Sequence, residues 1–215
     1  MTKLITYPNS ICSSSFTKEA KHITTKLDKS VKFALKNTGK EYHIAKKLSD
    51  VFPETKGKRA RGWPIGSTYD DLDAVHTDIG VFLFEIPKRR NPNYLLAHET
   101  GHMLDSSFYN LTGSNFSKTN GYIKKYNKDL GKFDENCKKY HIDRKCLNLD
   151  YFIQGSKKDK PTEAGLSETF AELYATIKNN GYEIIDKRFK GVMKNLFPNT
   201  TKYVTKLVNM LGDKV

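Results

Sequence analysis

Two histidines and a glutamate form the pattern His-Glu-x-x-His at residues 98–102 of this 215-residue chain. On a helix, four residues at about 100° each place His98 and His102 within about 40° of one another. Two imidazoles one turn apart can bind the same Zn²⁺ ion, and Glu99 can reach a water bound to that ion. Zinc lowers the pKa of such a water from about 15.7 towards about 7. Glu99 would then take its proton and later deliver it to a leaving amine, which is the chemistry of zinc-dependent peptide hydrolysis.

This short motif also has a simpler interpretation, in which polar residues merely lie on a solvated helix face. The surrounding sequence favours the metal site. Asn91 and Pro92 are typical of a helix start, with Asn as the N-cap and Pro at the first helical position. An apolar strand is predicted just before them, at residues 80–86. We therefore expect the motif on a capped helix that runs to about Phe108.

A second helix, predicted from about Glu163 to Asn180, could supply the third protein ligand that catalytic zinc usually has. Glu168 and Glu172 share one face of this helix, and apolar side chains fill the opposite face. One carboxylate could bind the ion, and the other could orient a ligand histidine. An ordinary amphipathic helix with a solvated acidic face remains the alternative.

Together, HETGH with the following Met-Leu-Asp105, and the downstream SETFAELYA, resemble the metallopeptidase domain of anthrax lethal factor. They equally resemble the small clostridial Pro-Pro endopeptidases of the same family. The segment Gly66–Asp73 and the strand before the motif are also similar. The resemblance covers roughly residues 62–108 and 162–178, and it implies a zincin-like α+β fold. It further implies a zinc endopeptidase that acts on a peptide or protein.

Carried over residue by residue, the resemblance implies that His98, His102 and Glu168 bind Zn²⁺. It implies that Glu99 is the general base and that Glu172 orients a ligand histidine. Secretion or delivery into a host is suggested by the family alone. The N-terminal residues show no secretory signal, so a cytoplasmic location stays open.

The chain departs from the family pattern at the group that would stabilise the oxyanion. Family members commonly carry a tyrosine about two helical turns before the ligand glutamate, and Pro161 occupies that position here. The interval of 66 residues between His102 and Glu168 is also longer than usual. Tyr151 could reach the site from a rearranged loop, and the alternative is a packed or surface tyrosine.

The pattern along the chain predicts one metallopeptidase domain, residues 1–215, in two lobes. A lobe of about residues 1–108 would hold N-terminal helices, a small mixed sheet and the HETGH helix. A helical lobe of about residues 109–215 would supply the ligand glutamate. Helical periodicity covers residues 17–50, with Ala45 and Leu48 as a possible continuation into a second helix. Further helices are predicted near 119–130, 133–141 and 199–212, and Pro53–Gly66 is predicted as loop.

An extended substrate is expected to pair with the strand at 80–86, which we predict to border the cleft. Trp63 and Tyr69 lie in the loop before it and are candidates either for lining a pocket or for packing the loop down. His76 and His141 have no partner at ligand spacing, so we predict surface or packing roles for them. A monomer is expected.

The net charge of +13 suggests a different function, because strongly basic chains often bind nucleic acids or anionic surfaces. The first 61 residues carry +9 of this charge, whereas residues 62–104 carry −3. No sequence signature of a nucleic-acid-binding fold is present. A basic nucleic-acid or anionic-surface binder is therefore the second hypothesis, and a zincin-like binding module without catalysis is the third.

Two further classes of protein are disfavoured by the sequence. The apolar run Val81–Phe84 is far too short to span a membrane, so no transmembrane segment is expected. The three cysteines are too few for a disulfide framework, although Cys137 and Cys146 are near enough in sequence to leave their pairing open.

Overall fold

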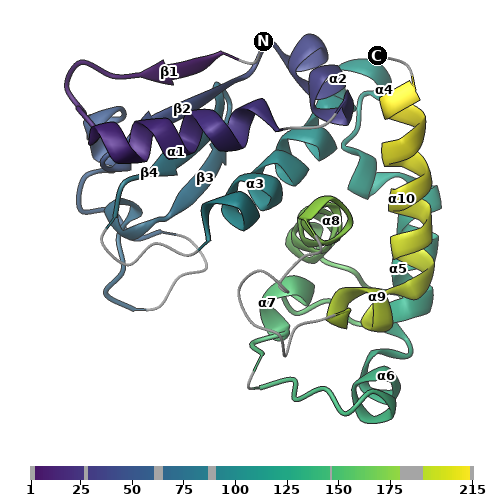
Figure 1. The fold of residues 1–215 in the computed structure, drawn as a ribbon. Coiled ribbons are helices and arrows are strands. Elements are labelled where there is room, and N and C mark those ends of the chain that lie inside the picture. Colours follow the sequence, from purple (N-terminus) through teal and green to yellow (C-terminus); the bar gives the residue numbers. More distant parts are fainter. Residues whose placement is uncertain are drawn as a thin grey trace.

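The computed structural model of the chain describes residues 3–26, 29–60, 65–86, 91–145, 147–179 and 191–213. Within them, a small sheet and its covering helices lie beside a group of helices from the second half of the chain (Figure 1). No helix in these ranges is both long enough and apolar enough to cross a bilayer. The architecture is α+β, as predicted.

The sheet has four strands in the order β1-β2-β4-β3. Their bounds are Leu4–Thr6 (β1), Glu41–Ala45 (β2), Ala74–Thr77 (β3) and Gly80–Phe84 (β4). β2 runs parallel to β1 and β4, whereas β3 is antiparallel to β4. The prediction of a small mixed sheet is therefore confirmed. Every residue of β4 is buried, which explains its continuous apolar sequence.

The expected pairing of a substrate with the strand at 80–86 is wrong. β4 lies inside the sheet, and its backbone is already paired with β2 on one side and β3 on the other. No row of free backbone groups is left for a peptide. Among the described strands, β3 forms the edge on this side of the sheet.

The N-terminal helical region is shorter than predicted. Helix α1 spans Ser14–Thr25 and α2 spans Lys29–Thr38. Gly39 then adopts a positive φ of 65°, which glycine reaches without strain, and β2 follows. The continuation of helix through Ala45 is wrong, because this residue ends a strand that pairs with β4. Leu48 begins a single 3₁₀ turn, Leu48–Asp50.

Helix α3 spans Pro92–Ser107 and begins as predicted. The Asn91 side chain accepts hydrogen bonds from the backbone N–H groups of Asn93 and Tyr94. α3 packs between the sheet and α8, which spans Glu163–Asn179. The two helices touch at Gly101, where an added Cβ would lie only 2.6 Å from Ala171 Cα.

The other helices form the second part of the molecule. They are α4 (Tyr109–Thr112), α5 (Asn120–Leu130), α6 (Phe133–Lys139), α7 (Asp150–Ile153), α9 (Val192–Leu196) and α10 (Pro198–Asp213). The predicted helices near 119–130, 133–141, 163–180 and 199–212 are confirmed within a few residues. Cys137 is buried, and Cys146, its possible partner, lies outside the described residues.

Candidate metal centre

Three candidate ligands converge from two helices that are distant in sequence. α3 supplies His98 and His102, and α8 supplies Glu168. One potential ligand atom of each lies within 4.8 Å of the other two. Glu168 Oε2 is 3.3 Å from His98 Nε2 and 3.6 Å from His102 Nε2. The structure thus brings together the three residues that the sequence nominated.

The donor atoms at this point suit a divalent cation. Two imidazole nitrogens and one carboxylate oxygen are a donor set that Zn²⁺ accepts in hydrolytic sites. Glu168 Oε2 is buried and has no hydrogen-bond partner among the described residues, which is costly for a carboxylate unless a cation balances it. The residues present therefore fit a zinc ion.

Both histidines are oriented by hydrogen-bond partners on α8. Glu172 Oε2 lies 3.1 Å from His98 Nδ1, and Ser167 Oγ lies 3.0 Å from His102 Nδ1. Because each Nδ1 is engaged in this way, each Nε2 is directed at the centre. Sequence analysis nominated Glu172 but missed Ser167. The one feature of the sequence that could have indicated Ser167 is its position directly before the candidate ligand Glu168.

A third supporting residue, Tyr94, was also missed. Its hydroxyl donates a 2.5 Å hydrogen bond to Glu172 Oε2, and Glu172 is completely buried. Tyr94 lies one helical turn before His98 and so shares its helix face. That shared face is the feature of the sequence that could have indicated a supporting role for Tyr94.

The electrostatics of the cluster reflect close packing of acids and imidazoles. Burial favours neutral His98, but Glu168 and Glu172 outweigh it and raise the pKa of His98 to about 10. Burial also tends to raise the pKa of Glu168, yet His102 and His98 hold that pKa well below its ordinary value. A metal ion would replace the shared proton, because zinc binds the unprotonated imidazole.

Beside the ligands lies a cavity of about 290 Å³. It is lined by Ala60, Tyr69, Leu72, Ala74, Val75, His76, Glu99, His102, Tyr151 and Glu168. Glu99, the predicted base, thus faces the same space as two of the candidate ligands. Tyr151 reaches this space from α7, and Tyr69 lines it from the loop before β3. Trp63 lies outside the described residues.

His76 belongs to this cavity as well, which sequence reasoning did not predict. Its Nε2 is 2.7 Å from Lys40 Nζ, and its ring centre is 6.5 Å from that of His102. Burial, helped by the charges of Lys40 and His102, lowers the pKa of His76 to about 3. Only the pairing of β3 with β4 brings His76 here, so no local pattern reveals it. His141 is exposed, as predicted.

Comparisons with known proteins place the fold. The sequence matched no protein family and no curated protein. Among solved structures, a Pro-Pro endopeptidase from Paenibacillus alvei superimposes with a TM-score of 0.56 over 95% of this chain and 96% of that chain. The two sequences are 24% identical. At this identity the comparison shows a shared fold, and it leaves the predicted resemblance to anthrax lethal factor untested.

Proposed function

We propose that the protein is a zinc-dependent endopeptidase that hydrolyses a peptide bond of a peptide or protein substrate. The observation that carries the proposal is the cluster of His98, His102 and Glu168 with Glu99 in the adjoining cavity. The similar fold of an endopeptidase supports it. In this proposal the chain is one zincin-like domain whose two lobes, about 1–108 and 109–215, each supply ligands.

His98, His102 and Glu168 would hold the ion, and Glu172 and Ser167 would fix the two imidazoles. Bound Zn²⁺ would polarise the scissile carbonyl and acidify the attacking water. Glu99 would accept the proton of that water and then pass it to the amine that leaves. Its place at the cavity wall, next in sequence to His98, suits both transfers.

Tyr151 is the candidate for stabilising negative charge on the carbonyl oxygen. Because Pro161 replaces the tyrosine expected at the start of α8, the hydroxyl has to come from another element. Tyr151 of α7 lines the same cavity as Glu99 and Glu168, and its phenol can donate a hydrogen bond. We propose that it takes the role of the missing tyrosine.

The substrate would pair with β3 and not with β4. The backbone N–H of Phe84 donates to the carbonyl of Asp73, so Asp73 faces β4. Strand groups alternate in direction, and the outward N–H and C=O groups therefore belong to Ala74 and His76. Both residues line the cavity, so an extended peptide added at this edge would pass the metal centre.

The proposal is tested by comparing the wild-type protein with Glu99→Gln. Metal content measured by mass spectrometry should show about one zinc per chain in both proteins. Cleavage of a peptide library should be lost in the variant, whereas Glu163→Gln, at an exposed α8 residue, should cleave normally. Equal cleavage by wild type and Glu99→Gln would reject the mechanism. Bound zinc without cleavage would favour the inactive binding module.

A further inference from the structure

Five exposed lysines lie on three helices, α2, α5 and α10, of which α10 packs against the other two. Lys124 and Lys128 project from α5, and Lys202 and Lys206 project from α10, each pair one helical turn apart. Lys29 of α2 packs beside the C-terminal end of α10. All five are exposed. We call this the α5–α10 lysine surface, and it combines residues from the basic N-terminal segment with residues from the far end of the chain.

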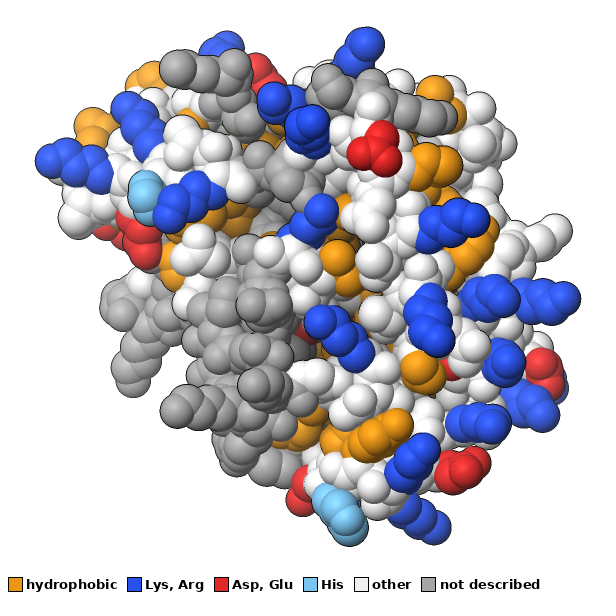
Figure 2. Space-filling view, turned by 45° about the vertical axis from the view of Figure 1, so that its right-hand side comes forward, with side chains coloured by type: hydrophobic (Ala, Val, Ile, Leu, Met, Phe, Trp, Pro, Cys, Tyr) orange, Lys and Arg blue, Asp and Glu red, His pale blue; other side chains and the backbone are white. Residues whose placement is uncertain are grey.

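The two helices that carry four of these lysines, α5 and α10, pack against each other. Gly121 at the start of α5 packs against Tyr203, and Asp129 near its end accepts hydrogen bonds from Asn199 and Thr200. The two helices therefore run in opposite directions where they meet, and the N-terminal part of α10 lies against α5. In Figure 2, which turns the side of the molecule with α10 towards the reader, lysine and arginine side chains outnumber acidic ones.

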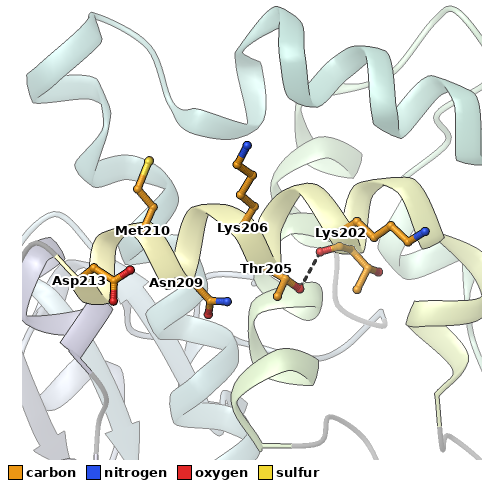
Figure 3. A pocket seen from close by; sticks show the side chains of 7 residues that line it. Lys202, Thr205, Lys206, Asn209, Met210 and Asp213 are labelled. Carbon is orange, nitrogen blue, oxygen red and sulfur yellow. Dashed lines mark hydrogen bonds between the residues drawn. The ribbon is translucent and has the colours of Figure 1, made fainter.

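The charges of the five lysines are not paired with acidic side chains in the part of the chain that the structure describes. Among the described residues, none of the five lysines forms an ion pair. The acidic residue of α5, Asp129, is buried with both oxygens engaged by α10, so it does not neutralise the surface. Asp213 is the acidic member of the shallow hollow along α10 (Figure 3). A cluster of like charges of this kind is stabilised by an anionic partner.

The composition of the surface selects among anionic partners. Nucleic-acid sites typically use arginine forks and aromatic stacking, and α2, α5 and α10 contain no arginine. The surface instead places an apolar side chain, Met210, 45% exposed, in the same hollow as Lys202 and Lys206. In Figure 3 Met210 and Lys206 leave α10 on the same side. Lysine charges around an exposed apolar side chain are suited to a lipid headgroup layer.

We propose that the α5–α10 lysine surface binds an anionic phospholipid bilayer. The cavity beside the candidate metal centre is lined by residues of β3, α3, α7 and α8 together with Ala60, Tyr69 and Leu72, and none of its lining residues belongs to α5 or α10. The lysine surface therefore shares no lining residue with this cavity. This inference is independent of the proposed peptidase activity.

The test is binding of the full chain to phosphatidylcholine vesicles with and without phosphatidylglycerol. One variant carries Lys124→Glu, Lys128→Glu, Lys202→Glu and Lys206→Glu. The matched control makes the same change at four exposed lysines of the sheet region, Lys18, Lys21, Lys46 and Lys47, and so has the same net charge. Circular dichroism and zinc content report whether each variant is folded.

The wild type should bind the anionic vesicles with an affinity that falls with salt, and should bind neutral vesicles at least about tenfold more weakly. The first variant should lose at least about tenfold in affinity, and the control should lose much less. Equal losses in the two variants would overturn the proposal, because binding would then follow net charge. Tighter binding to duplex DNA than to the vesicles would also overturn it and favour nucleic acid as the partner.

Discussion

The Tyr94 hydroxyl and the Glu172 carboxylate are joined by a 2.5 Å hydrogen bond inside the protein. Glu172 Oε2 accepts that bond and also lies 3.1 Å from His98 Nδ1, while Oε1 has no partner among the described residues. The carboxylate can rotate or shift unless a fixed donor holds it. In the proposed zinc centre, Tyr94 would therefore act through Glu172, as a positioning residue.

Replacing Tyr94 with Phe should weaken zinc binding by about tenfold while the fold is kept, because outer hydrogen bonds of this kind tune metal affinity. Competition with a chromophoric chelator measures the affinity. Tyr42→Phe is the matched control, since its buried hydroxyl forms a hydrogen bond with Thr100. Equal loss of zinc affinity in the two variants would show a general packing effect and no positioning role.

Tyr151→Phe should lower kcat by about 100-fold with little change in KM, because a donor to the oxyanion acts in the transition state. Zinc content should stay the same. The exposed Tyr140 provides a control, and Tyr140→Phe should leave kcat unchanged. An unchanged kcat in Tyr151→Phe would mean that the phenol only packs against neighbouring side chains.

Pairing of the substrate with β3 can be tested from the substrate side. Once a cleaved peptide is known, its backbone amides can be N-methylated one at a time. KM should rise at alternate positions, because an added strand bonds to β3 through every second residue. If KM rose equally at every position, or at no position, the substrate would not be pairing with β3 as an added strand.

The stability of the metal-free protein should depend on pH through His98. Its pKa rises from 6.5 in the unfolded chain to about 10 in the cluster, so the protonated form is the one that folding favours. The resulting stabilisation is complete below pH 6.5 and is lost as the pH rises towards 10. Urea unfolding of chelator-treated protein should therefore show a decreasing free energy of unfolding across this interval.

Two controls isolate this contribution. His98→Gln should remove the decrease, and zinc-loaded protein should not show it, because the ion takes the place of the proton. If the metal-free wild type and His98→Gln had the same pH dependence, the charge on His98 would not contribute to stability.

The sequence predicted those parts of the structure that depend on local chemistry. Asn91 and Pro92 start α3 because side-chain capping and a fixed φ act within one turn. Spacing alone also placed His98 and His102 on one face. The strand at 80–86 was predicted from its apolar run, but β1, β2 and β3 were not, because their pairing with neighbours stabilises them, as when Glu41–Ala45 pairs with β4 instead of extending α2.

Among the residues that support the candidate centre, some were indicated by the local sequence and others gain their roles only through tertiary contacts. Glu172 could be nominated because it shares a helix face with Glu168. Ser167 and Tyr94 gain their roles only when α3 meets α8, and His76 does so only when β3 joins the sheet. These contacts link residues far apart in the chain, so no local pattern contains them.

The contact between Gly101 and Ala171 sets how closely α3 and α8 approach, and so the spacing of the three candidate ligands. Here α3 and α8 meet backbone to backbone, and Glu168 lies three residues before Ala171 on α8. Ligand distances differ among cations, at about 2.0–2.2 Å for zinc with nitrogen or oxygen and about 2.3–2.6 Å for calcium. A side chain at position 101 would force the helices apart and widen the space between imidazoles and carboxylate. In the proposed zinc centre, the ionic radius that fits best would thus be set by a glycine that donates no ligand atom.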